Sequence, residues 1–349
     1  MINNSFFSTE ILRWFRENGR DLPWRETRDP YAIWLSEIIL QQTRIAQGWE
    51  YWERFVQTYP KVEDLAAASE DDVLKLWQGL GYYSRARNLH TAAKQIVALG
   101  AFPNTLEGIK SLKGVGDYTA AAIGSFAFGI QAAVVDGNVY RVLSRYFGID
   151  TPINSTQGKK EFAALAQSLL PASDAASYNQ GMMDFGAIQC TPQSPKCLLC
   201  PLAETCEALR CGRVEELPVK NKTVKVKTRH LSYIYIRCKS SAADGIGKSE
   251  PMVAIHRRGE GDIWQGLWEP YNVSDVKELP SFVKNPILLA KDVKHVLTHR
   301  ILLADFYLLE TESRPPLPDD YIWIRESEIE DYGVPRLIEI MLEKINPAE

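Results

Sequence analysis

The segment CTPQSPKCLLCPLAETC, residues 190–206, constrains the fold more than any other stretch of this chain. Its four cysteines are separated by six, two and five residues. Three prolines favour a loop that can wrap around an inorganic core, and four thiolates suit zinc or an iron–sulfur cluster. Zinc knuckles usually contain two CxxC pairs, and this segment contains one, so we predict a four-iron four-sulfur cluster rather than zinc or unrelated buried cysteines. The predicted ligands are Cys190, Cys197, Cys200 and Cys206.

The chain upstream of this segment has the pattern of an all-helical domain. From Thr9 to about Leu209, apolar residues recur at intervals of three and four, as in Tyr31, Trp34 and Ile38. A polar run rich in lysine and arginine follows at 211–229, and we predict that it is a linker.

The chain downstream of the linker changes to the alternating pattern of strands. Residues 231–237, 251–256 and 301–309 are predicted strands, and residues 335–344 have helical spacing. The predicted fold class is therefore multidomain α and α/β. It comprises a helical domain over 1–210, a linker over 211–229 and a mixed α/β domain over 230–349.

Composition limits the class of protein. A chain of 349 residues suggests two domains, and the formal net charge of −4 gives no general attraction for a polyanion, so nucleic-acid binding must come from local patches and backbone amides. The first 20 residues carry charges among their apolar side chains, and no apolar stretch reaches the roughly 20 residues that span a bilayer. Cys211 and Cys238 indicate no disulfide framework. We expect a cytoplasmic protein.

A glycine-rich turn precedes an alanine-rich helix. The residues LKGVG at 112–116 lead into the run 118–126. Gly114 and Gly116 allow a tight turn, and the helix N-terminus offers free amides to a phosphate. On its own, this pattern equally fits an ordinary turn between helices.

Two carboxylates have surroundings that should separate their pKa values. Glu37 lies in a helix that begins at Asp29 and has apolar neighbours, so burial should raise its pKa and keep a proton available. Asp136 precedes the next helix, where the helix dipole favours the charged form. This is the pattern of glycosidic-bond cleavage through an oxocarbenium-like state. Taken alone, Asp136 also fits a plain N-cap and Glu37 a solvated helix face.

Several motifs together resemble one family. They are LPWR (22–25), SEIILQQT (36–43), GLGYYSRA (79–86), VVDGN (134–138), the hairpin, the cysteine segment, WQGLW (264–268) and HVLTH (295–299). The chain resembles the helix-hairpin-helix DNA glycosylases with an iron–sulfur loop, and within them the adenine DNA glycosylase (MutY) family. The resemblance implies a base excision repair enzyme that flips adenine out of duplex DNA and hydrolyses its N-glycosidic bond when it is mispaired with 8-oxoguanine or guanine. It also implies a monomer at the bacterial nucleoid, with a Nudix-like C-terminal domain that recognises 8-oxoguanine.

The resemblance implies roles for individual residues. Gln42 and Tyr82 would fill the gap that the flipped base leaves. Leu297, Thr298 and His299 would contact 8-oxoguanine. The residues implied to line or support the adenine pocket are Arg20, Trp24, Arg25, Leu40, Thr43, Gln180 and Asp184. The implied catalytic residues are Glu37, Asp136, Tyr118 and Asn138, and the implied hairpin contacts to DNA are Gly114 and Gly116.

Structural alternatives stay open for several of these residues. Trp24 and Leu40 would equally suit a hydrophobic core. The amide of Gln180 and the carboxylate of Asp184 could read the edge of a base. The two residues would equally suit a polar helix face. His299 would equally suit an exposed strand end.

Tyr118 decides the reaction class. Relatives that resemble endonuclease III carry a lysine at this position, which attacks the sugar as a Schiff-base nucleophile. A phenol cannot form an imine, so we predict a monofunctional glycosylase that uses water. Lys113 and Asp117 depart from the residues usual in the hairpin, and the segment after Trp268 lacks the glutamate-rich helix with which Nudix hydrolases bind magnesium.

Two other functions stay open at this point. One is a pyrimidine-lesion glycosylase and lyase similar to endonuclease III, which Tyr118 and the C-terminal domain disfavour. The other is a non-catalytic iron–sulfur module that binds DNA or transfers electrons, which the pairing of Glu37 with Asp136 disfavours.

Overall fold

The helical pattern of the first part of the chain is confirmed by the computed structural model, which describes residues 4–221, 226–239, 250–274 and 279–346. The chain divides into two densely packed units. The first comprises residues 1–66 and 91–222, and the second comprises residues 67–90 and 223–349. None of the described helices combines the length and the apolar character needed to cross a membrane.

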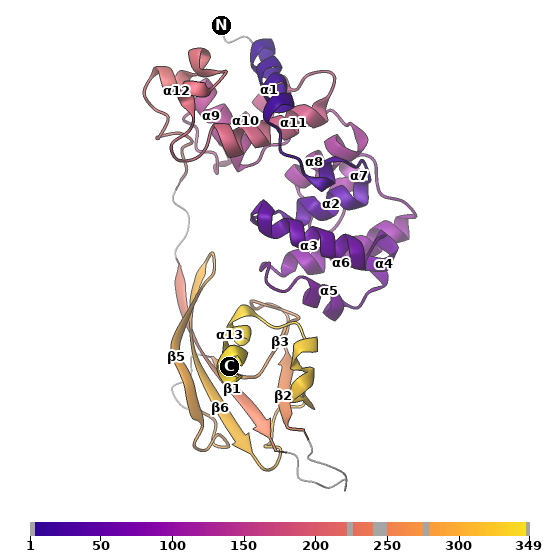
Figure 1. Cartoon of the computed structure of the whole chain (residues 1–349), viewed down its shortest axis with the longest axis vertical. Helices are drawn as coiled ribbons and strands as arrows, with labels where there is room; N and C mark the ends of the chain where they lie inside the picture. Colours follow the sequence, from indigo (N-terminus) through magenta and orange to yellow (C-terminus); the bar gives the residue numbers. More distant parts are fainter. Residues whose placement is uncertain (1–3, 222–225, 240–249, 275–278, 347–349) are drawn as a thin grey trace. The chain divides into compact units, whose positions relative to one another are not determined.

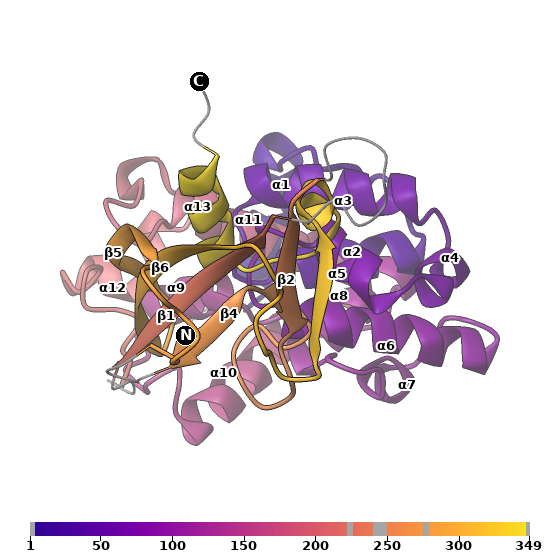
Figure 2. The same cartoon turned by 90° about the horizontal axis from the view of Figure 1, so that it is seen from below.

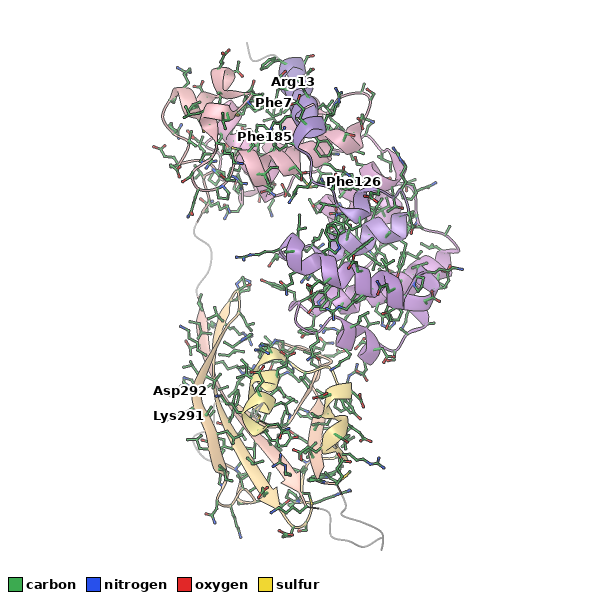
Figure 3. The ribbon with its side chains drawn as sticks, viewed as in Figure 1. Phe7, Arg13, Phe126, Phe185, Lys291 and Asp292 are labelled. Carbon is green, nitrogen blue, oxygen red and sulfur yellow. The ribbon has the colours of Figure 1, made fainter. Side chains whose placement is uncertain are left out.

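The first unit is built from helices that pack their apolar faces together. They are α1 (Asn4–Asn18), α2 (Pro30–Ile39), α3 (Ile45–Thr58), α4 (Val62–Ala67), α7 (Leu106–Lys110), α8 (Asp117–Phe128), α9 (Gly137–Phe147), α10 (Thr156–Leu169), α11 (Ala175–Asp184), α12 (Glu207–Arg210) and the second half of α6 (Ser84–Leu99). Helix α1 packs along α11, although the two are far apart in the sequence (Figure 1). Figure 3 shows Phe7 of α1 and Phe185 among the side chains of this core, where both are buried.

A π-helical turn, Phe185–Gln189, continues α11 and ends at Cys190. The helical pattern predicted for this part of the chain therefore continues through α11 and this turn up to Cys190. The turn lies against α9, because a Cβ atom added to Gly186 would be 2.5 Å from the Cβ atom of Asn138. Only glycine allows this close approach, which brings the end of α11 and the start of α9 together.

The described residues of the second unit contain a seven-stranded sheet with the path β3-β2-β1-β6-β5, in which β4 pairs with β1 and β7 pairs with β2. The strands are β1 (Lys227–Cys238), β2 (Met252–Arg257), β3 (Trp268–Glu269), β4 (Tyr271–Ser274), β5 (Ile287–Val296), β6 (Arg300–Thr311) and β7 (Tyr321–Arg325). Strands β1 and β6 are parallel along their whole length, and the other pairs are antiparallel. Helix α13 (Arg336–Ile345) packs on β5 and β6 (Figure 2).

Alternation along β1 fills two cores. Leu231, Tyr233 and Tyr235 belong to the core that includes α13, whereas Ile234 and Ile236 belong to the core on the other face. Both faces of the strand are therefore buried, and the period of two that predicted the strand separates the two cores.

The structure corrects the predicted linker at its end. Strand β1 begins at Lys227, so residues 227–229 lie in the sheet rather than in the linker. The reason is long-range pairing: Lys227 aligns with Arg300 and Arg229 aligns with Leu302. The charge of Arg229 made this position look like part of the polar linker. In the folded chain Arg229 forms an ion pair with Asp262 at 2.7 Å, so the charged residue can lie within the strand.

The predicted 1–210 domain also differs from the division that the structure shows. Residues 67–90, which include α5 (Glu70–Leu76), pack with the C-terminal strands. Arg257 of β2 donates a hydrogen bond to Glu70 at 2.9 Å, and Gly266 lies so close to α5 that an added Cβ atom would be 3.1 Å from the side chain of Leu74. These contacts join segments almost 200 residues apart in sequence, which no local pattern could reveal.

Candidate active site

A cavity of about 750 Å³ in the first unit brings together residues from α2, the loop after it, the start of α8, the start of α9 and α11. It collects most of the residues predicted for the pocket and for catalysis. Those that line it are Arg20, Trp24, Arg25, Glu37, Leu40, Gln42, Thr43, Gly116, Tyr118, Asp136, Asn138 and Gln180. Gly114 and Asp184 do not line it.

Glu37 is held by a helix that is buried on almost every side. Asp29 caps α2 by accepting a hydrogen bond from the Tyr31 amide at 3.0 Å, and Pro30 occupies the first turn, where its missing N–H is harmless. Every residue of α2 from Tyr31 onward is buried, Glu37 included. The helix thus carries a carboxyl group away from water.

The environment of Glu37 shifts its titration to near neutral pH. Burial raises the pKa of Glu37 to about 7, as the sequence predicted. A hydrogen bond with Tyr118 and the charge of Arg25 lower that pKa, whereas the charge of Asp136 raises it further. Because the pKa is close to physiological pH, Glu37 can both hold and release a proton there.

The hairpin between α7 and α8 delivers Tyr118 to the same cavity. Gly114 adopts a φ of 79°, which favours glycine, and Gly116 caps α8. The Tyr118 hydroxyl donates a hydrogen bond to the sulfur of Met183 at 3.7 Å, and its interaction with Glu37 lowers the pKa of that carboxyl group. Burial raises the pKa of Tyr118 well above its ordinary range, and the charge of Glu37 adds to this effect, so the phenol stays neutral.

The two unusual hairpin residues lie on the surface. Asp117 forms an ion pair with Lys110, and both side chains are more than half exposed. The Lys113 amide donates a hydrogen bond to Gln95 Oε1 at 2.7 Å. Neither residue disturbs the turn that positions Tyr118.

Asp136 caps α9 and faces the cavity. Its Oδ1 atom accepts a hydrogen bond from the Val139 amide at 2.7 Å, and its Oδ2 atom accepts one from Asn138 Nδ2 at 2.7 Å. Burial nevertheless raises the pKa of Asp136 above its ordinary value, against the lowering effect of these bonds and of Arg141. The prediction that the helix terminus sets the direction of the Asp136 pKa shift is therefore wrong, because removal of the carboxylate from water has the larger effect.

Two buried arginines on α9, which sequence reasoning missed, connect Asn138 to the first cysteine. Arg141 donates hydrogen bonds to Asn138 Oδ1 and to the Cys190 carbonyl, both at 2.8 Å. Arg145 donates to the Thr191 carbonyl at 2.7 Å and lies 3.5 Å from Cys190 Sγ. Two arginines spaced four apart on an apolar helix face indicate buried cations that need hydrogen-bond partners. This pattern could have identified Arg141 and Arg145 from the sequence.

Asp184 anchors two arginines of the cavity and does not line it. Its side chain is fully buried, and it accepts hydrogen bonds from both Nη atoms of Arg25 at 2.8 Å and from Nε of Arg20 at 2.9 Å. Burial would raise the pKa of Asp184, but the hydrogen bonds from Arg25 and Arg20 hold it below its usual value. The interpretation of Asp184 as a reader of base edges is wrong, because both oxygen atoms are occupied.

The remaining residues that line the cavity differ in how deeply they are buried. Trp24 is buried with its ring centroid 5.8 Å from Trp49 and 5.6 Å from Trp52, and it still lines the cavity. Gln42 is exposed and adopts a φ of 57°, which is unusual for a residue with a side chain. Gln180 is half-buried on α11.

The four cysteines are half-buried and form no disulfide bonds, and Cys190, Cys197 and Cys206 lie close enough to Cys200 to raise its pKa. Burial raises the pKa of Cys200 to about 12, and the charges of Cys190, Cys206 and Cys197 each add to this effect. Four thiolates so close together need a compensating cation, so the donor set fits an iron–sulfur cluster, which supplies that charge when it is bound. Across the described parts of the chain, no three candidate ligands are arranged about a single metal ion.

The residues predicted to read the opposite base lie in the second unit, around another cavity of about 1010 Å³. Leu297, Thr298 and His299 form the turn between β5 and β6, closed by a 2.8 Å hydrogen bond from the Leu297 amide to the Arg300 carbonyl. Tyr82 lines the same cavity with a φ of 48°, and its hydroxyl lies 2.6 Å from Thr298 Oγ1. The structure therefore brings these four predicted residues together.

Three family models match the chain. Residues 35–171 match the HhH-GPD superfamily base excision DNA repair protein, residues 190–206 match the iron–sulfur binding domain of endonuclease III, and residues 246–344 match the NUDIX domain. The four cysteines are therefore the ligand set of an endonuclease III-type iron–sulfur domain.

Individual relatives agree with these matches. The adenine DNA glycosylase of Buchnera aphidicola subsp. Acyrthosiphon pisum is 36% identical over 265 residues, which are 75% of this chain and 73% of that protein. The adenine DNA glycosylase of Buchnera aphidicola subsp. Schizaphis graminum is 30% identical over 355 residues, with 97% and 98% of the two chains covered.

Among solved structures, a thermostable thymine-DNA glycosylase is 34% identical with a TM-score of 0.56, over 60% of this chain and 97% of that one. An endonuclease III bound non-covalently to DNA is 23% identical with a TM-score of 0.53, over 61% of this chain and 99% of that one, and it shares the fold. The hairpin, the iron–sulfur segment, the NUDIX domain and the match over nearly the whole chain show that this chain belongs to the adenine DNA glycosylase family of DNA-binding base excision repair enzymes.

Proposed function

We propose that this chain removes adenine that lies opposite 8-oxoguanine or guanine in duplex DNA, and that the flipped adenine enters the cavity around Glu37. The observation that carries the proposal is a buried acid with a pKa of about 7 in one cavity with a second carboxylate, Asp136. In this proposal the helical part is the catalytic domain and the C-terminal part reads the opposite base. The protein acts as a monomer on chromosomal DNA in the cytoplasm.

Glu37 is the general acid of the proposed reaction. Adenine is a poor leaving group until one of its ring nitrogens is protonated. A carboxyl group with a pKa near 7 carries a proton at physiological pH and transfers it readily. Tyr118 lies in the same cavity, and its interaction with this carboxyl group lowers the pKa of Glu37.

Asp136 stabilises the sugar cation that forms as the base departs. Its carboxylate is held by the Val139 amide and by Asn138, so it needs no reorganisation when the positive charge develops. Tyr118 offers no amine for an imine with the sugar, so the cation is captured by water and the DNA strand stays intact.

The walls of the cavity suit a flat, polar base. Trp24 and Leu40 supply apolar surface, and Thr43 and Gln180 supply hydrogen-bonding groups. Arg20 and Arg25 together carry one more positive charge than Asp184 cancels, which favours the phosphate-rich DNA strand at the entrance.

Outside the cavity, the residues proposed to contact DNA have either a positive φ angle or an exposed position. Gln42 and Tyr82 have positive φ angles and exposed side chains, as expected of residues that fill the gap in the base stack. Gly114 and Gly116 leave the hairpin amides accessible to a phosphate. Thr298 and His299 offer a hydroxyl and an imidazole to the C8 and N7 positions, where 8-oxoguanine differs from guanine.

Single-turnover base release tests the proposal. The substrates are duplexes with adenine opposite 8-oxoguanine, guanine or thymine, with thymine opposite guanine, and with thymine glycol. Adenine opposite 8-oxoguanine should be released fastest, without strand cleavage. Faster release of thymine or of thymine glycol would overturn the assignment, and the Glu37→Gln variant serves as the inactive control.

A further inference from the structure

The segment that carries Asp136 into the cavity has no regular secondary structure. It runs from Gly129 to Asp136, between the end of α8 and the start of α9. The strands that the structure describes all belong to the second unit, so none of them pairs with this segment. Its backbone groups must find other partners, because an unpaired buried amide or carbonyl is costly.

A side-chain amide from α10 pairs with the outer side of this segment. Gln167 donates a hydrogen bond from Nε2 to the Gln131 carbonyl at 3.0 Å. Its Oε1 atom accepts a hydrogen bond from the Ala133 amide at 3.0 Å. Gln167 is exposed, so this pairing lies at the surface of the unit.

A second side-chain amide, from α11, pairs with the inner side. Asn179 donates from Nδ2 to the Ala132 carbonyl at 2.9 Å, and its Oδ1 atom accepts from the Val134 amide at 3.1 Å. The other Nδ2 hydrogen is donated to Ser125 Oγ of α8 at 2.9 Å. Asn179 is 1% exposed, so water cannot replace these bonds.

The side-chain amides of Gln167 and Asn179 form hydrogen bonds with alternate residues of the segment. Gln167 bonds residues 131 and 133, and Asn179 bonds residues 132 and 134. This is the alternation with which neighbouring strands pair with the two sides of a central strand. Two side chains therefore fix the register of the segment, in place of a sheet, up to two residues before Asp136.

We propose that Asn179 and Gln167 are positioning residues for Asp136, with Asn179 the more important because it is buried. The inference rests on the role proposed for Asp136 above. Between Val134 and the Asp136 cap on α9 only one residue intervenes, so a shift of the segment moves the carboxylate directly. A displacement of about 1 Å in a reacting group can cost about 100-fold in rate.

The test is the single-turnover rate of adenine release in the full chain carrying Asn179→Asp. This variant keeps the size of the side chain but places an oxygen atom against the Ala132 carbonyl. The rate should fall by about 10- to 100-fold. Affinity for a duplex with a non-cleavable adenine analogue and iron content should be unchanged. A rate equal to that of the unmodified protein would overturn the proposal.

A double-mutant cycle separates positioning from general damage to the fold. When Asp136→Asn has already removed the carboxylate charge, Asn179→Asp should cause no further loss. The same fold-loss in both backgrounds would show a merely structural role and overturn the inference. Asp136→Asn with an undiminished rate would instead refute the proposed role of Asp136, so the two failures are distinguishable.

The exposed partner keeps the proposal testable if the Asn179 variant does not fold. Gln167→Leu removes both surface bonds and should slow adenine release several-fold without loss of thermal stability. Ser168→Ala is the matched control, because Ser168 is exposed on the same helix and donates its hydroxyl to Leu165 of that helix. Equal rates for Gln167→Leu and Ser168→Ala would overturn the role of Gln167 as a positioning residue and the proposed pairing of the segment by two side-chain amides.

Discussion

Replacing Glu37 by glutamine should slow the release of adenine strongly and, at high pH, stabilise the fold. Glu37 is buried, and its pKa is about 7 in place of the ordinary 4.5. The folded chain therefore binds the Glu37 proton more tightly than the unfolded chain does. The resulting stability is complete below about pH 4.5 and is lost as the pH rises through about 7.

The size of this effect follows from the two pKa values. Each pKa unit corresponds to about 1.4 kcal/mol, so the ionised Glu37 costs the fold about 3 kcal/mol above pH 7. Glutamine cannot ionise and avoids this cost. Between pH 6 and pH 8.5, the stability of the variant relative to the unmodified chain should grow by about 1.4 kcal/mol. For a unit of this size, that corresponds to about 3–6 °C in melting temperature.

The catalytic effect should have the opposite sign. Loss of the general acid should lower the single-turnover rate of adenine release by at least about 100-fold. The rate of the unmodified protein should fall as the pH rises above 7, because the protonated fraction of Glu37 falls. The residual rate of the variant should show no inflection near pH 7.

The assay combines quenched single-turnover cleavage between pH 6 and pH 8.5 with thermal unfolding at the same pH values. Glu50→Gln on α3 is the matched control, since Glu50 is exposed and should change neither quantity. The reasoning is refuted if Glu37→Gln releases adenine at nearly the unmodified rate, or if its relative melting temperature is independent of pH.

Four further outcomes test other parts of the site. Tyr118→Lys should gain strand cleavage and form an adduct with DNA that borohydride traps, whereas an efficient adduct with the unmodified chain would contradict the monofunctional assignment. Cys197→Ser should lower iron content, visible absorbance and DNA affinity together, and stoichiometric zinc without iron in the unmodified protein would exclude the cluster. Thr298→Ala combined with His299→Ala should reduce the preference for 8-oxoguanine over guanine by about 1–3 kcal/mol per lost contact, with little change in cleavage opposite guanine. Asp184→Asn should destabilise the fold by about 3–5 kcal/mol in thermal unfolding, because it leaves two partly buried arginines short of a counter-charge; an unchanged melting temperature would argue against that anchor.

Local patterns in the chain were enough to predict the elements that carry the site. The spacing of apolar residues predicted α2, and Asp29 with Pro30 predicted where it begins. The cysteine spacing predicted the iron–sulfur segment, and the family match confirms it. These features depend on residues a few positions apart, whose preferences act before any tertiary contact forms.

The interactions that tune the site could not be predicted from the sequence, because each depends on partners that are distant in the chain. Asp184 carries a carboxylate that could read the edge of a base, yet two arginines from the segment between α1 and α2 occupy both its oxygen atoms. Asp136 sits where a helix terminus favours ionisation, yet burial by other elements reverses the direction of its pKa shift. Charge and burial of this kind are properties of the packed chain.

The sequence by itself determined the helical and α/β parts, the four cysteine ligands and the glycine-rich hairpin, because these depend on residue type and short-range spacing. The two carboxylates were selected by the family resemblance, since the pattern around each also fits an ordinary helix residue. Only the tertiary structure decided which side chains share a cavity, how far burial moves the pKa of Glu37, and which amides hold the segment before Asp136. The physical reason is that desolvation and hydrogen-bond geometry arise from atoms brought together across many residues of chain, and a linear pattern contains no information about which distant atoms meet.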